Sequence, residues 1–84
     1  MTDILPGDDV WPLLRAYLGP AVYKAECVVR EPDLPELVKA RYEEGERIHQ
    51  RDWLERDEAW FDQMIREEAA DLIAYILMKR VKFG

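Results

Sequence analysis

Apolar residues recur along most of this chain three and four positions apart, which is the spacing of an amphipathic helix. The pattern predicts helices at residues 9–18, 20–29, 35–50 and 57–82. The second segment, "AVYKAECVV", also alternates well enough for a short strand. We favour a helix because the chain offers no second convincing strand to pair with it. The sequence therefore predicts an all-α fold, a small antiparallel bundle of three to four helices, in one domain over residues 1–84.

Capping and turn residues separate these helices. Asp8 and Asp9 are suited to cap the first helix, and Pro12 is tolerated in its first turn. The stretch "REPDLPE" predicts a loop, because its prolines fix the backbone and cannot continue a helix. The stretch "QRDWLERDE" predicts a turn, or a partly helical link, between two antiparallel helices.

The size of the chain bears on its oligomeric state. It has 84 residues, enough for one domain. A monomer of this size buries only about 60% of the surface that its unfolded chain exposes, so its stability is modest. Three tryptophans and four tyrosines are a large aromatic load for so short a chain. We therefore expect a homo-oligomer, a dimer or a tetramer, in which another copy covers apolar helix faces.

Charge and cysteine content exclude several classes of function. The formal net charge is −6, whereas non-specific binding to nucleic acid or to an anionic membrane needs positive charge, so neither is expected as a partner. Cys27 is the only cysteine and is expected to be a small apolar residue in a reducing cytoplasm. The start, "MTDILPGDD", lacks the features of a signal peptide. The apolar run at residues 72–78 is too short to span a bilayer.

Three acidic residues stand at the entrance to the apolar half of the last helix. A rotation of about 100° per residue gathers one apolar stripe from Phe61, Met64, Ile65, Leu72, Tyr75 and Ile76. Glu68 falls inside that stripe, Asp71 lies at its edge, and Glu67 points toward solvent. An ionised carboxylate withdrawn from water needs a proton, a cation or a metal as its partner. Two acids three residues apart on one face can hold the same ion, and Mg²⁺ prefers oxygen ligands.

The preceding helix supplies further candidate ligands. Its segment "RYEEGERIHQRDW" contains Glu43, Glu44, Glu46, His49 and Asp52. Its apolar side is centred on Leu37, Val38, Arg41, Gly45 and Ile48. Glu46 and His49 flank that side, whereas Glu43 points further away. A glycine inside a helix costs about 1 kcal/mol relative to alanine, and we expect Gly45 to permit the close approach of a neighbouring helix or a ligand.

The two acidic segments together resemble a known family. The stretch "EEAADLIAYIL" is similar to the second metal-binding helix of the MazG-like all-α nucleotide pyrophosphohydrolases. The pattern of that family is Glu-x-x-Glu, a gap, and then Glu-x-x-Asp. Here Glu43-x-x-Glu46 precedes Glu68-x-x-Asp71, with 21 residues between the two pairs.

The resemblance covers residues 37–79, and "ARYEEGERIHQRDW" also resembles a stretch of small phage-type dATP/dGTP diphosphohydrolases. It implies a Mg²⁺-dependent enzyme, in which the metal activates a water that attacks a nucleoside triphosphate and releases pyrophosphate. The metal ligands that it implies are Glu43, Glu46, Glu68 and Asp71. Arg41 and Lys79 are then candidates for contacts with the phosphates.

A non-catalytic function remains open. The chain would then be a small helical interaction protein, encoded by a phage and binding a host protein. The contact face would be aromatic, built from Trp11, Tyr17, Trp53 or Trp60. The acids would form a solvated rim, and Glu68 would pair with Arg41 or Lys79 across a helix interface.

A third hypothesis is a ferritin-like metal site assembled between protomers from Glu46, His49 and Glu68. It depends on Glu46-x-x-His49, which has the spacing used by di-iron carboxylate bundles. The alternative for His49 is a position at the surface.

Overall fold

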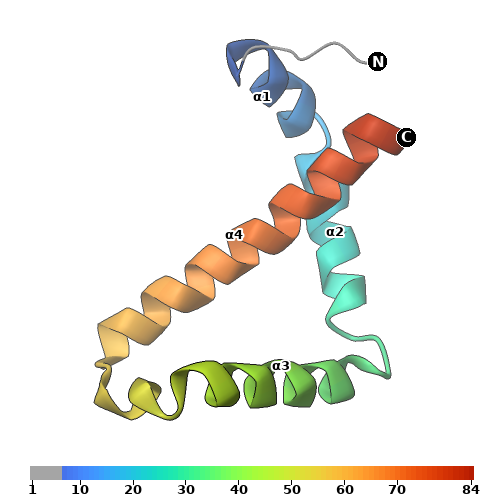
Figure 1. Cartoon of the computed structure of the whole chain (residues 1–84). Helices are drawn as coiled ribbons and strands as arrows, with labels where there is room; N and C mark the ends of the chain where they lie inside the picture. Colours follow the sequence, from blue (N-terminus) through green and yellow to red (C-terminus); the bar gives the residue numbers. More distant parts are fainter. Residues whose placement is uncertain (1–6) are drawn as a thin grey trace.

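The computed structural model describes residues 7–84, with side chains from Val10 onward. Four α-helices and one short 3₁₀ helix follow one another: α1 Gly7–Arg15, α2 Leu18–Val28, α3 Leu34–His49, η1 Asp52–Glu55 and α4 Glu58–Phe83 (Figure 1). No strand occurs in this described part of the chain. The predicted all-α fold is therefore confirmed, and residues 20–29 are helical rather than extended.

Local signals account for the ends of α3 and α4. The side chain of Asp57 caps α4 by accepting a hydrogen bond from the backbone N–H of Trp60 at 2.9 Å. Pro35 lies in the first turn of α3, where its missing N–H has no helical partner to lose. At the other end of α3, Gln50 takes a positive φ of 58°, and its N–H donates to the carbonyl of Glu46 at 2.7 Å. This left-handed residue turns the chain out of α3 toward η1.

The first helix begins earlier than the sequence pattern predicts. It starts at Gly7, so Asp8 and Asp9 lie within its first turn and do not precede it. The prediction that these two residues cap the helix is therefore wrong. Pro12 consequently falls in the second turn, where a proline leaves one helical carbonyl without its donor.

The helices pack together at one end of α4. There α1 and α2 contact the C-terminal half of α4, and α2 crosses it (Figure 1). Ala21 and Ala25, one turn apart on α2, and Leu77 on α4 are the buried hydrophobic residues of the described chain. The small alanine side chains let the α2 and α4 backbones approach closely, which makes this crossing the core.

α3 packs along no other helix of the chain. In Figure 1 it forms one side of a triangle whose other sides are α2 and α4, and none of its described residues is buried. The predicted antiparallel packing of α3 beside α4 is therefore wrong for a single chain. The reason lies in the packing of α2, which crosses the C-terminal half of α4 and leads into α3 at the far corner of the triangle, away from α4.

The chain is more open than a compact domain of its length. Its Cα radius of gyration is 16.2 Å, against about 12 Å for a compact chain of this size. Its accessible surface is 7498 Å², against about 5,200 Å² for a compact monomer of 10.0 kDa. Even α4, which has 26 residues, is not apolar enough to cross a membrane, and neither is any other described helix. The helices therefore leave apolar faces that nothing in the described chain covers.

α4 packs through a different face from the one that the sequence pattern predicts. Leu77 is the buried residue of α4. In the predicted stripe Ile65 and Tyr75 are 65% and 70% exposed, and its other apolar residues, Phe61, Met64, Leu72 and Ile76, are half-buried. Leu77 and Glu68 are nine positions apart, and a rotation of about 100° per residue puts them on opposite sides of the helix. Glu68 is exposed, so the prediction that it turns inward is wrong for a single chain. The cause is that α4 is apolar on two sides, and α1 and α2 cover only one of them.

Candidate functional site

The acid pair on α4 lies on the open side of that helix. Glu68 and Asp71 are one turn apart, and both are exposed. Neither forms an ion pair or a side-chain hydrogen bond with another described residue, whereas Gln63 donates a hydrogen bond to Glu67. Two carboxylates on one face are therefore available to a cation or a basic side chain from outside the chain.

The acid pair on α3 is paired with cations from α3 and the turn that follows it. Lys39 Nζ lies 3.0 Å from Glu43 Oε2, and Arg51 Nε donates to Glu46 Oε2 at 2.6 Å. This hydrogen bond, together with the negative charge of Glu46, raises the pKa of the Arg51 guanidinium above its usual value. Exposed pairs of this kind contribute little to stability. They do, however, offset the charge of two predicted metal ligands.

The two acid pairs do not come together in one chain. Since α3 and α4 do not pack on each other, Glu43 and Glu46 stay apart from Glu68 and Asp71. Among the described side chains, no group of three or more His, Cys, Asp or Glu residues could hold a metal ion. A single chain therefore does not fit the Mg²⁺ site that the resemblance implies. The magnesium prediction stays a prediction, and it requires a second chain.

A shallow hollow lies between the end of α3 and η1. It is lined by Tyr42, Gly45, Glu46, His49, Gln50, Asp52 and Trp53. A Cβ atom built on Gly45 meets no atom within 4 Å, so no other helix of the chain makes the close approach that we expected there. Glu46 and His49 share this hollow, but Glu68 is on α4, which does not pack against α3. The di-iron hypothesis likewise stays a prediction that needs another protomer.

The two predicted phosphate contacts are also on separate helices. Arg41 is exposed at the centre of the apolar side of α3, and Lys79 is exposed near the end of α4. Neither forms an ion pair with another residue of the described chain. Within one chain they therefore serve no common site.

The four aromatic residues predicted to bind a partner form two groups instead of one face. Trp11 on α1 is 51% exposed, and Tyr17 lies beside the end of α4, under the guanidinium of Arg80. Trp60 lies in the first turn of α4, and Trp53 lies in η1 just before it. Twenty positions of α4 separate Trp60 from Arg80, which is about 30 Å along the helix axis. The two aromatic groups are therefore separate surfaces and do not form the single contact face that we predicted.

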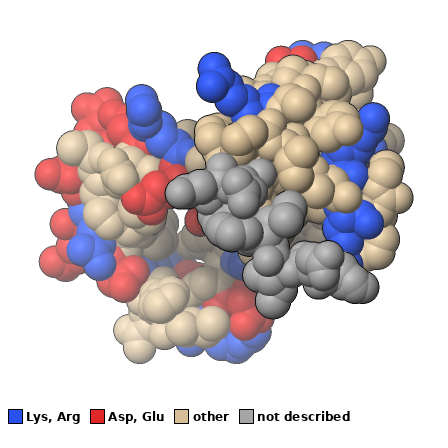
Figure 2. Space-filling model, turned by 90° about the horizontal axis from the view of Figure 1, so that it is seen from above, with Lys and Arg blue, Asp and Glu red and all other residues tan. Residues whose placement is uncertain are grey.

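Charge is distributed unevenly, which the net charge does not indicate. Residues 10–29 and 72–84 carry five Lys and Arg and a single acid, Glu26, whereas residues 30–71 carry seven Lys and Arg and fourteen Asp and Glu. The first two segments pack together as α2, the last turns of α4 and α1 without its first turn, which contains Asp8 and Asp9. In Figure 2 this part of the surface is mostly tan with blue side chains, while the red side chains gather on the other side. We name residues 10–29 and 72–84 the basic end.

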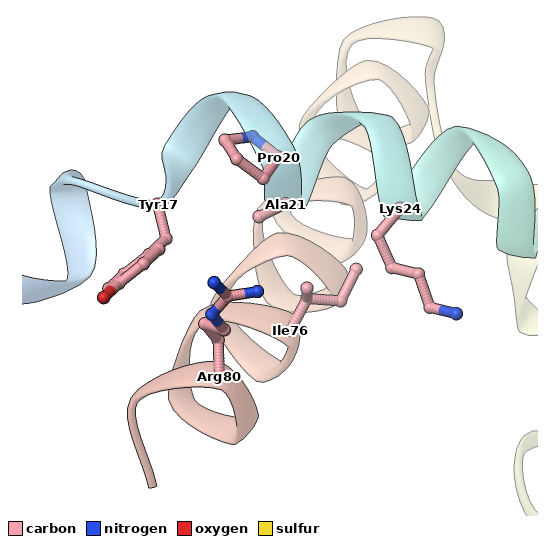
Figure 3. A pocket seen from close by; sticks show the side chains of 6 residues that line it. All are labelled: Tyr17, Pro20, Ala21, Lys24, Ile76 and Arg80. Carbon is pink, nitrogen blue, oxygen red and sulfur yellow. The ribbon is translucent and has the colours of Figure 1, made fainter. Parts of the chain in front are cut away.

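A second shallow hollow marks the crossing of α2 and α4 at the basic end (Figure 3). It is lined by Tyr17, Pro20, Ala21, Lys24, Ile76 and Arg80. The sequence pattern did not single out Lys24 or Arg80 as site residues. The sequence carried no signal for them, because the burial of Ala21 and Leu77, three positions before Lys24 and Arg80, is decided by the packing of α2 on α4.

Comparison of the chain with protein-family models, with curated proteins and with solved structures finds no match. The resemblance to the MazG-like pyrophosphohydrolases therefore depends on the two short acidic motifs alone. Any function proposed for this chain has to follow from its own residues and their arrangement.

Proposed function

We propose that this chain is a small helical interaction protein that binds another protein through its basic end. The main observation behind the proposal is that α1, α2 and the end of α4 bury little of their apolar surface against one another. Among the side chains from Val10 onward, only Ala21, Ala25 and Leu77 are buried. The large hydrophobic residues that remain exposed at the basic end are Trp11, Leu13, Leu18, Val22, Tyr23, Val29, Tyr75, Met78, Val81 and Phe83. Apolar surface of this extent on a short chain is typical of a protein-binding site.

The charges around this surface indicate the chemistry of the partner. Lys24, Lys79 and Lys82 are exposed, and none of them forms an ion pair with another described residue. Basic residues around an apolar patch attract and orient an acidic surface, while the apolar contacts supply most of the affinity. We therefore expect a partner with an apolar patch inside an acidic rim, a host protein if the chain is encoded by a phage.

Affinity capture from a host lysate tests this proposal with charge reversals. The double variant Lys24→Glu/Lys82→Glu reverses two charges at the basic end. The control Lys39→Glu/Arg47→Glu changes the net charge by the same amount on α3, where both cations pair with acids of their own helix. The wild type and the control are expected to recover the same protein, and the basic-end variant about tenfold less of it. Equal recovery by all three, or no specific protein with the wild type, contradicts the proposal.

The Mg²⁺-dependent nucleoside triphosphate pyrophosphohydrolase that the resemblance implies is a second candidate. The observation in its favour is the pair Glu68 and Asp71, which share an open face of α4 without partners in the described chain. One chain does not bring Glu43 and Glu46 to this pair. The enzymatic function therefore requires two chains.

Calorimetry with Mg²⁺ and Mn²⁺, with and without a non-hydrolysable nucleotide, tests the second candidate. The wild type is expected to bind metal, and Glu68→Gln is expected to abolish pyrophosphate release with unchanged helicity. Glu67→Gln is the matched control. Glu67 accepts a hydrogen bond from Gln63 and lies outside the face of Glu68 and Asp71. Absence of metal binding, or full turnover in Glu68→Gln, counts against an enzyme.

A further inference from the structure

The uncovered sides of α3 and α4 share one spacing of residues. The α3 side consists of Leu34, Leu37, Val38, Arg41, Gly45 and Ile48, which we name the α3 face. The α4 side consists of Phe61, Met64, Ile65, Glu68, Leu72 and Tyr75, which we name the outer α4 face. Each residue of the outer α4 face lies 27 positions after its counterpart in the α3 face. Successive members of each set are close enough in helical rotation to lie along one side of their helix.

Both faces contain large hydrophobic residues that are open to solvent, while Leu34 on the α3 face and Phe61, Met64 and Leu72 on the outer α4 face are half-buried. No described residue of α3 is buried, and the space above Gly45 is empty within 4 Å of an added Cβ atom. Ile65 and Tyr75 on the outer α4 face are among the most exposed large hydrophobic residues of the described chain. This face lies opposite Leu77, so the packing of α1 and α2 does not cover it.

Each face contains one charged residue, and the two charges have opposite signs. Arg41 occupies the central position of the α3 face, and Glu68 occupies the same position in the outer α4 face. Packing two α3 faces together opposes Arg41 to another arginine, and packing two outer α4 faces opposes Glu68 to another glutamate. Only α3 against α4 joins opposite charges. A single charged residue in an apolar helix seam selects the partner helix in this way.

We propose that a second copy of this chain covers both faces, with α3 of each copy on the outer α4 face of the other and Arg41 paired with the partner's Glu68. Two-fold symmetry forms the contact twice, so each copy contributes one α3 and receives one. Gly45 then lies across from a large residue for either helix direction, the partner's Leu72 if the helices are parallel and the partner's Met64 if they are antiparallel. A glycine opposite a large side chain allows the helices to approach.

The available area suits a dimer. The chain as a whole exposes about 2,300 Å² more than a compact monomer of its mass, and the two faces supply one part of this excess and the basic end another; a stable interface needs about 800 Å² on each partner. The proposed contact leaves α1 and α2 uncovered, and it shares only Leu72 and Tyr75 with the basic end. It also gives Glu68 a partner without a metal ion.

Sedimentation velocity with two charge reversals tests the pairing. The wild type is expected to be a dimer. Arg41→Glu and Glu68→Arg each place like charges in both contacts, and each is expected to weaken the dimer at least about tenfold. Mixed in equal amounts, the two variants are expected to restore a dimer, because each contact again joins one acid and one base. Native mass spectrometry identifies the mixed dimer by its mass.

Glu67→Arg is the matched control, because it changes the net charge as Glu68→Arg does at a neighbouring position outside the face. It is expected to leave the dimer intact, and a mixture with Arg41→Glu is expected to show no rescue. Circular dichroism checks that each variant stays helical. A monomeric wild type, a dimer that neither reversal weakens, or variants that recover only when both changes are in the same chain would each overturn the proposal. The last result would mean that α3 packs on α4 of its own chain.

Discussion

Arg80 lies over the ring of Tyr17, with its Cζ atom 4.8 Å from the ring centroid. This contact joins the end of α4 to the turn between α1 and α2. It stands beside a core that consists of little more than Ala21, Ala25 and Leu77. Because so few contacts hold the basic end together, the loss of any one of them is expected to be measurable.

Replacing Arg80 with methionine removes the cation and keeps much of the apolar length of the side chain. We expect Arg80→Met to lower the free energy of unfolding by about 0.5–1 kcal/mol, the usual contribution of an exposed cation–π contact. Lys82→Met is the control. Lys82 Nζ lies 5.2 Å from the ring of Phe83, which is in the same helix, so this contact does not connect two helices. Urea unfolding followed by circular dichroism measures both variants. If both variants lose the same free energy of unfolding, the contact between Arg80 and Tyr17 does not stabilise the packing of the helices.

Shortening the buried side chain of α4 tests where the core lies. Leu77→Ala is expected to destabilise the fold by about 2–5 kcal/mol, because it leaves a cavity where α2 crosses α4. Met78→Ala removes a similar volume from the next position, which is exposed, and is expected to cost less than about 1 kcal/mol. Thermal unfolding compares the two. If the two midpoints fall by the same amount, the packed side of α4 is not the side of Leu77.

The left-handed residue after α3 offers a way to stabilise the chain. Gln50 has a φ of 58°, a conformation that glycine adopts without the steric penalty of a side chain. Gln50→Gly is expected to raise the free energy of unfolding by about 0.5–1 kcal/mol. Gln63→Gly, the same change inside α4, is expected to lower it by about 1 kcal/mol. Scanning calorimetry of both variants should therefore give midpoint shifts of opposite sign, and a lower midpoint for Gln50→Gly would contradict the positive φ.

The cap of α4 gives a local prediction. Asp57→Ala removes the acceptor for the N–H of Trp60 and is expected to cost about 1 kcal/mol, whereas Asp57→Asn keeps an acceptor and is expected to cost less. Asp62→Ala lies within the same helix but provides no cap. Hydrogen exchange of the first turn of α4 should be faster in Asp57→Ala alone. Unchanged exchange there would show that the cap is not needed.

The sequence by itself indicated three to four helices and placed the ends of α3 and α4 within about one residue, but the helix predicted over residues 9–18 ends at Arg15 and α2 already begins at Leu18. Pro35 and Asp57 act on the turn that contains them, so their effects can be read without knowing the rest of the fold. The start of α1 was misplaced because an aspartate suits the first turn of a helix as well as its cap, and local propensity does not separate the two positions. The common face of Glu68 and Asp71 was likewise predictable, because a spacing of three residues within one helix fixes it.

The meeting of the two acid pairs was not predictable in this way. Whether Glu43 and Glu46 approach Glu68 depends on how α3 packs against α4, and the apolar pattern of each helix is satisfied without that packing. The division of Trp11 and Trp60 between opposite ends of α4 has the same origin. Contacts between helices depend on residues far apart in the chain.

Only the tertiary structure decided which side of α4 is buried. Periodicity identifies an apolar stripe around Glu68, but the side of Leu77 is apolar as well. The choice depends on Ala21 and Ala25, whose small side chains let α2 come close to the side of Leu77 and leave the side of Glu68 open. The packing energy depends on side chains of both α2 and α4, so the pattern of residues within α4 alone cannot show which side is buried.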